Sequence, residues 1–136
     1  MGKFVLTDAY VSIDGNDMSD HVASVTVNYS AEMQDDTAMG DGTHKRIGGL
    51  KDWSVDIEFH QDFASSNVDA ILFPLVGSTF TIIVRPVKTG GVGSTNPNYT
   101  GTAILESYKP LGGSVGDLAK ASVTIPGSGT LSRATS

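Results

Sequence analysis

Hydrophobic and polar residues alternate with a period of two over several short segments of this chain, as they do in β-strands with one buried face. Segment 24–29 places Val25, Val27 and Tyr29 on one face. The clearest alternation runs from 52 to 59, where one face carries Trp53, Val55, Ile57 and Phe59 and the other carries polar side chains. Both segments therefore predict half-buried strands.

Further strands are predicted where β-branched and aromatic residues gather. These segments are 3–13, 78–87, 99–110 and 118–127. Asp14-Gly15 follows the first of them and indicates a hairpin turn, because both residues tolerate positive φ. The polar tail 128–136 has Leu131 as its only large apolar residue, and the sequence leaves its structure open.

Helical spacing occurs once, over about 65–76, where apolar residues recur at intervals of three and four. These residues are Val68, Ile71, Leu72 and Leu75. Ser66 and Asp69 resemble a capping box at the start, and Gly77 suits the end. Pro74 indicates an irregular last turn. The predicted fold is mainly β, a single domain over 1–136 built as a two-sheet β-sandwich or barrel with one flanking α-helix.

The segment 30–49 has no period and is predicted to be a long irregular loop. Long loops inside small domains are uncommon and are usually functional. This one has an acidic half and a short basic half, and it also contains apolar side chains that a solvated loop does not need. We expect it to order against a neighbouring subunit through Glu32, Met33, Asp35, Asp36, Met39, Asp41, His44, Lys45, Arg46 and Ile47.

Composition limits the classes of function that are compatible with this chain. The chain has 136 residues, a net charge of −6 and no cysteine, so a disulfide framework and a cysteine-based zinc site are excluded. Its few, scattered Lys and Arg residues argue against tight DNA binding, which needs a basic face. No signal peptide or membrane-spanning segment is predicted, which favours a soluble protein made in the cytoplasm.

Three catalytic or ligand-binding patterns fail on their context. The sequence 112–116 matches G-x-S-x-G, but all three histidines precede Ser114 and a strand is predicted after it. His44 and His60, with the nearby aspartates, fit no known metal-ligand spacing. The glycine-rich segment 90–96 lacks the lysine of a phosphate-binding loop. We therefore expect no enzyme, no cofactor and no metal.

The order of these segments resembles the major tail protein, or tail tube protein, of long-tailed, siphovirus-type bacteriophages. The resemblance covers nearly the whole chain, and its most characteristic part is "GDGTHKRIGGLKDWS" at 40–54, followed by "NVDAILFPLVG" at 67–77. It implies a β-sandwich with one helix, hexameric rings stacked into a tube, and a loop that reaches a neighbouring subunit or ring.

The resemblance also implies a location in the virion tail after synthesis in the host bacterial cytoplasm. Partners would be other copies of the chain and tail proteins such as the tape measure, tail tip and terminator. DNA would pass through the tube without specific binding. Polar strand faces are the candidates for the channel wall, and these are Asp56 and Glu58, or Ser24, Thr26 and Asn28.

A second hypothesis is a monomeric β-sandwich that binds carbohydrate or a host surface. Such modules expose aromatic platforms, whereas Trp53 lies in register with apolar residues and is predicted to be buried. For His44, beside two cations, we expect only a weak pH effect on assembly.

Overall fold

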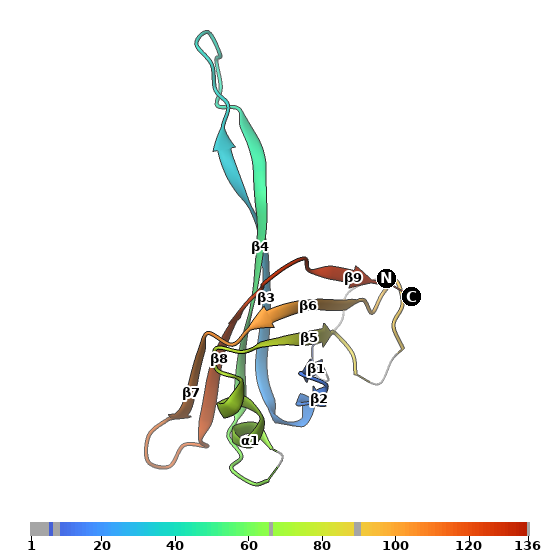
Figure 1. The fold of residues 1–136 in the computed structure, drawn as a ribbon, viewed down its shortest axis with the longest axis vertical. Coiled ribbons are helices and arrows are strands. Elements are labelled where there is room, and N and C mark those ends of the chain that lie inside the picture. The colour runs from blue at the N-terminus through green and yellow to red at the C-terminus, as the bar shows by residue number, and fades with distance from the viewer. Residues whose placement is uncertain (1–5, 7–8, 66, 89–90, 136) are drawn as a thin grey trace.

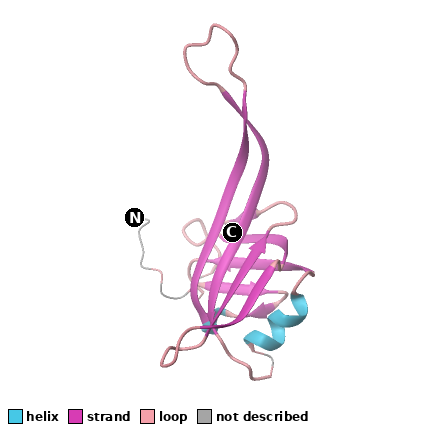
Figure 2. Cartoon of the chain, turned by 90° about the vertical axis from the view of Figure 1, so that its left-hand side faces the viewer, coloured by secondary structure: helices cyan, strands magenta, loops and turns pink. Residues whose placement is uncertain are grey.

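The computed structural model describes residues 6, 9–65, 67–88 and 91–135. Its strands form two antiparallel sheets that pack face to face (Figure 1, Figure 2). The five-stranded sheet has the order β2 (Asn16–Asp17), β1 (Tyr10–Ile13), β5 (Thr79–Arg85), β6 (Asn98–Ile104) and β9 (Ser132–Ala134). The four-stranded sheet has the order β3 (Val22–Asp35), β4 (Arg46–His60), β8 (Lys120–Pro126) and β7 (Ser107–Gly112). The predicted mainly-β sandwich is therefore confirmed.

The turn between β1 and β2 is the predicted Asp14-Gly15 hairpin turn. Asp14 has φ 52° and Gly15 has φ 81°, the left-handed conformation that both central residues of a type I′ turn require. A 3₁₀ turn, η1 (Ser19–His21), then leads the chain from this small hairpin into the other sheet.

The core lies between the two sheets and is built from alternating residues of their inner faces. From β4 it takes all four side chains that the alternation predicts, and Phe59 has no exposed surface at all. β8 lies beside β4 in the same sheet and extends this layer, whereas the inner faces of β1 and β5 supply the opposing layer. The buried apolar side chains of these four strands are Val11, Ile13, Trp53, Val55, Ile57, Phe59, Phe80, Ile82, Val84, Ala121, Val123 and Ile125.

Trp53 closes one end of this core, where its ring packs against the backbone at two glycines. Its indole Nε1 donates a hydrogen bond to the carbonyl of Gly129 at 2.9 Å. The ring lies so close to Gly101 and Gly127 that a Cβ atom at either position would overlap it. Both positions must therefore be glycine for the ring to lie flat against the chain.

The helix is shorter than predicted. The α-helix α1 covers only Val68–Leu72, and a 3₁₀ turn, η2 (Phe73–Leu75), continues it. The expected helix over 65–76 is therefore wrong in extent, because Pro74 has no N–H for a further α-helical bond. Gly77, at φ 81°, follows the last turn as predicted, whereas the capping residue Ser66 lies outside the described residues.

Two predicted segments have a different strand structure. The single strand expected over 99–110 is two strands, β6 and β7, which belong to different sheets and are separated at the buried Leu105. The polar tail contains β9, which pairs with β6 so that Ser132 is opposite Thr100. Alternation alone does not reveal where a chain crosses from one sheet to the other.

The irregular loop expected over 30–49 is also a correction. β3 and β4 stay paired out to Asp35 opposite Arg46, so only 36–45 is loop. A two-stranded ribbon that is exposed on both faces needs no alternation, because no side chain along it faces a core. The lack of hydrophobic alternation over 30–49 therefore reflects the exposure of both faces of the ribbon and not an irregular backbone.

A polar network ties α1 to the edge strand β7. The hydroxyl of Tyr108 donates to Asp69 Oδ1 at 2.8 Å and accepts a hydrogen bond from Gln61 Nε2 at 3.0 Å. Burial of the phenol, together with the neighbouring Asp69 carboxylate, raises the pKa of Tyr108 to about 12. The neutral phenol is thus favoured by the fold.

The glycines beside Trp53 give a stability prediction. Gly127→Ala forces its methyl group into the indole ring, and overpacking of this kind costs about 3 kcal/mol of unfolding free energy. Gly42→Ala is the matched control, since its Cβ meets nothing within 4 Å, and we expect a change of less than about 0.5 kcal/mol. Urea unfolding followed by the fluorescence of the single tryptophan measures both. Equal stability of the two variants would contradict this packing.

Tyr108 gives a pH prediction. Its pKa is raised by folding, so its contribution to stability is complete below pH 10, the ordinary value, and is lost as the pH rises through about 12. We expect an absorbance titration of the folded protein to show a tyrosine ionisation step near pH 12. Tyr108→Phe should remove that step; persistence of the step would assign it to another group.

Candidate assembly surfaces

The ends of β3 and β4 leave the sandwich together as a two-stranded ribbon, which we call the arm (30–52) (Figure 1, Figure 2). The body of the protein ends at Tyr29 and Trp53, which are paired. At the usual rise per residue, the strand portion of the arm extends roughly 20 Å beyond that pair. From 32 to 52, every side chain except the half-buried Asp41 is exposed.

The loop 36–45 at the end of the arm is closed by its own polar groups. The backbone N–H of Ala38 donates to Asp41 Oδ2 at 2.7 Å, and that of Lys45 donates to Thr37 Oγ1 at 2.9 Å. Lys45 Nζ lies 3.2 Å from Asp41 Oδ1. Hydrogen bonds from the Thr37 hydroxyl and N–H lower the pKa of Asp35. The loop therefore has a defined shape without contact to the body.

The ten predicted interface residues all lie on the arm, in two places. Asp36, Met39, Asp41, His44 and Lys45 belong to the loop, and Glu32, Met33, Asp35, Arg46 and Ile47 belong to the paired strands. The structure brings His44 Nδ1 to 3.9 Å from Asp35 Oδ2, with both side chains mostly exposed. Glu32 instead accepts a hydrogen bond from Gln34 at 2.9 Å.

The five predicted channel-wall residues meet on one surface, the outer face of the four-stranded sheet. Strand register places Thr26 beside Asp56, and Ser24 beside Glu58. Asn28 Nδ2 donates to Asp56 Oδ2 at 3.1 Å. The sequence offered β3 and β4 faces as alternatives, whereas pairing makes them a single polar surface.

This outer face also contains residues that the sequence analysis missed. β8 places Thr124 opposite Asp56 and Ser122 opposite Glu58, and Lys109 of β7 is opposite Ser122. Lys120 Nζ lies 3.6 Å from Glu58 Oε1. The alternation in segment 118–127 could have assigned Ser122 and Thr124 to a polar face, but nothing in the sequence showed which strands are neighbours.

Both outer strands of the four-stranded sheet lack a further strand partner among the described residues. These edges are β3, with 14 residues, and β7, with 6. Pro110 lies in β7, which agrees with the restriction of proline to edge strands.

A small polar cluster surrounds Asp62, just after the end of β4 that is opposite the arm. The Asp62 carboxylate accepts hydrogen bonds from Ala64 N–H and Asn67 and lies 3.1 Å from His21 Nε2. These bonds, led by that from Ala64, lower the pKa of Asp62.

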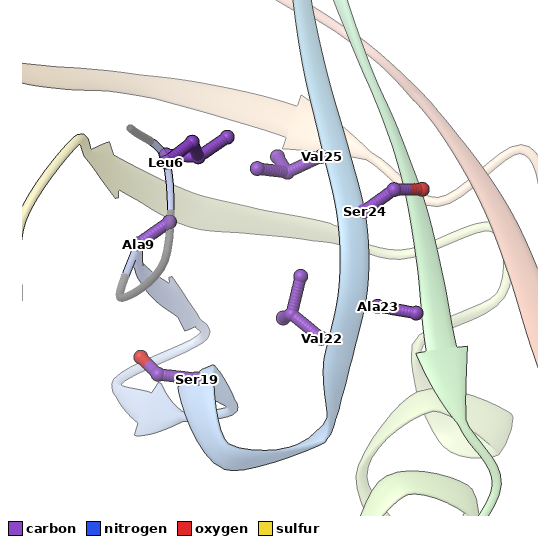
Figure 3. A pocket seen from close by; sticks show the side chains of 7 residues that line it. All are labelled: Leu6, Ala9, Ser19, Val22, Ala23, Ser24 and Val25. Atoms are coloured by element: carbon purple, nitrogen blue, oxygen red, sulfur yellow. The ribbon is translucent and has the colours of Figure 1, made fainter. Parts of the chain in front are cut away.

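The residues that were considered for catalysis or ligand binding show no arrangement comparable to these surfaces. Ser114 lies in the exposed turn between β7 and β8. In the described part of the chain, no group of three His, Asp or Glu side chains could hold a metal ion, and no helix could cross a membrane. A small hollow beside β3 is lined by Leu6, Ala9, Ser19 and residues 22–25, with no titratable side chain (Figure 3).

Comparison with known proteins shows the fold. No protein-family model and no curated protein sequence matches the chain. A chain in the virion of a native gene transfer agent particle matches at 18% identity and a TM-score of 0.71, covering 94% of this chain and 96% of that chain. A chain in the tail of an empty gene transfer agent particle with C6 symmetry matches at 18% identity and 0.70, covering 95% of each.

The Dit protein of SPP1, described as a hub of the adsorption apparatus of phages that infect Gram-positive bacteria, is also similar. It is 18% identical with a TM-score of 0.50, and the match covers 89% of this chain and 50% of Dit. The present chain thus corresponds to about half of Dit. At these identities the likeness establishes a fold that this chain has in common with phage-tail and gene-transfer-agent proteins.

The exposed arm gives a stability prediction. Replacing 32–50 by Asn-Gly joins the paired residues Ala31 and Lys51 through a two-residue turn. Because the removed side chains are outside the core, we expect the free energy of unfolding to change by less than about 1 kcal/mol. Urea unfolding measures it. A loss of several kcal/mol would mean that the arm supports the sandwich.

Proposed function

We propose that this chain is a tail tube subunit, six copies of which close into a ring through the edges of the four-stranded sheet. Rings stack into a hollow tube, and DNA passes through it during ejection without specific binding. The observation that carries this proposal is the four-stranded sheet itself, which has a polar outer face and two edge strands that have no further strand partner among the described residues. The shared fold with a chain from a C6-symmetric tail supports it.

Strand direction favours ring closure. All pairings in the order β3-β4-β8-β7 are antiparallel, so β3 and β7 run in opposite directions. Rotation about a ring axis keeps these directions, so β7 of one copy approaches β3 of the next as an antiparallel partner. Long exposed edges are otherwise an aggregation hazard. Pairing them in a closed ring would cover the β7 edge and the part of the β3 edge that faces it.

The outer face suits a channel for DNA. Asp56 and Glu58 are its two carboxylates in the paired region, balanced by Lys109 and Lys120. Its other side chains in these rows are hydroxyls, the Asn28 amide, the His60 imidazole and the Pro126 ring. Each phosphate neutralised by a protein cation adds affinity and would slow sliding. A wall without excess positive charge therefore permits passage, and the five predicted residues of β3 and β4 are its proposed lining.

The arm is the proposed contact between subunits of successive rings. It projects beyond the sheet along the molecule's longest axis, with a closed loop at its end (Figure 1). Its exposed apolar side chains would be solvated in a monomer and covered in an assembly. The ten arm residues named above are the proposed contact set.

Electron microscopy of the purified protein at high concentration tests this function. We expect the intact chain to form rings or tubes. The variant with Asn-Gly in place of 32–50 should form single rings at most, and no stacked rings or tubes. A second variant, with Asn-Gly in place of 36–45, keeps the paired strands and isolates the contribution of the loop.

A monomeric state of the intact, folded chain at all concentrations, including with preformed tail tips, would contradict the tube proposal. It would favour the alternative, a monomeric module that binds a carbohydrate or host surface. Equal assembly by the intact chain and the first variant would retain the tube and exclude the arm as a ring-to-ring contact.

A further inference from the structure

The two edges that the proposed ring would join differ in length. β3 has 14 residues and β7 has 6, so only part of β3 can face β7 of the next copy. Two rows of paired residues cross the whole four-stranded sheet and show which residues of its two edges lie at the same level. They are Thr26, Asp56, Thr124 and Ser107 in the first row, and Ser24, Glu58, Ser122 and Lys109 in the second.

A closed ring does not join these rows level with each other. Strands in a barrel tilt by about 35–45° from its axis, and the register shifts by a fixed amount around the barrel. Four strands about 4.8 Å apart carry a row roughly 19 Å across one subunit, and at that tilt the shift is about four to six residues. The shift is even, because channel-facing residues must lie opposite channel-facing residues.

β3 accommodates this shift in one direction only. Toward the arm, the shift places Ser107 opposite 30–32 and Lys109 opposite 28–30 of the next copy, and all these positions belong to β3. In the other direction Lys109 would lie opposite 18–20, which precede β3 and belong in part to η1. There the chain offers no strand with which β7 could pair.

We propose that β7 of one copy pairs with 28–32 of β3 in the next copy of the same ring, where the arm begins, and not with 24–26. This inference rests on the proposed tube function and specifies the register of its ring contact. Pro110 and a register shift against β8 occupy the second half of β7, so regular pairing is expected from Ser107 to Lys109. At the larger shift Glu32 of the arm would contact its own ring.

Charge on the channel face favours this register. In the described part of the chain, no ion pair includes Lys109 or Asp52. A shift of six puts Lys109 opposite Ser30, whose β4 partner is Asp52. A shift of four puts it opposite Asn28, which donates a hydrogen bond to Asp56. In the unshifted register the carboxylate in the same row is already paired with a lysine of β8.

The core-facing side of β3 has uncovered apolar surface at the same level. Tyr29 is 54% exposed, although it is paired with the buried Trp53. A hollow at this point is lined by Tyr29, Ser30, Ala31 and Lys51. In the proposed register, the residue of β7 opposite Tyr29 is Tyr108 or Pro110. Contacts between such cross-strand neighbours stabilise sheets, and this one would cover the Tyr29 ring.

Disulfide formation between introduced cysteines tests the register. A disulfide needs Cα atoms within about 7 Å, so it forms only between residues that are directly opposite. Ser107→Cys is combined in turn with Ser30→Cys, Glu32→Cys or Thr26→Cys, and every variant keeps Lys109. Within one chain Ser107 is separated from β3 by the width of the sheet, roughly 14 Å, so each disulfide joins two copies. Thermal unfolding under reducing conditions checks the fold, and electron microscopy shows whether rings form.

After oxidation, we expect the Ser30 pair or the Glu32 pair to give a ladder of linked chains that ends at six on a non-reducing gel. The Thr26 pair, which tests the unshifted register, should link no more than Ser107→Cys alone. Rings with a ladder from the Thr26 pair, or with no ladder from any pair, would overturn the register and leave the ring standing. A Ser30 or Glu32 ladder that passes six would retain the register and contradict the closed ring. Absence of both rings and ladders would overturn both.

Discussion

Backbone pairing between β3 and β4 is the interaction on which the rest of this structure depends. Within the sandwich it holds the inner face of β4 against the five-stranded sheet and places Asp56 and Glu58 beside β3 on the outer face. Beyond Tyr29 and Trp53 the same pairing continues without a core and becomes the arm. One ladder of hydrogen bonds thus links the core, the proposed channel wall and the proposed ring-to-ring contact.

The arrangement also explains how apolar surface is distributed. Trp53, packed against Gly101 and Gly127, closes the core at the base of the arm, so side chains beyond it have no interior to enter. α1 closes the opposite end through Val68 and Leu72 but leaves Phe73 exposed. What remains uncovered is at the two ends and along the edges of the four-stranded sheet. The proposed stacking of rings and pairing of sheet edges would cover these surfaces.

The sequence predicted the parts of the fold that local pattern determines. Alternation gave the inner face of β4, and Asp14-Gly15 gave the first turn, because each depends only on neighbouring residues. The extent of the arm was not predictable from alternation, since a ribbon exposed on both faces imposes none. The division of 99–110 between two sheets depends on tertiary packing at Leu105. Similarly, the channel-wall residues were recognisable as polar faces, but their union on one sheet required the register between strands.

Cysteine cross-linking directly tests whether the edges of the four-stranded sheet join between neighbouring subunits. The chain contains no natural cysteine, so introduced cysteines are the only ones present. Thr26 of β3 and Lys109 of β7 are exposed on the same outer face, at opposite edges of the sheet. The chain carrying both Thr26→Cys and Lys109→Cys, treated with a short bifunctional maleimide, should give a ladder of linked chains that ends at six. Each single variant should give at most dimers. If the doubly substituted chain also stops at dimers, or if its ladder continues past six, the closed hexameric ring is contradicted.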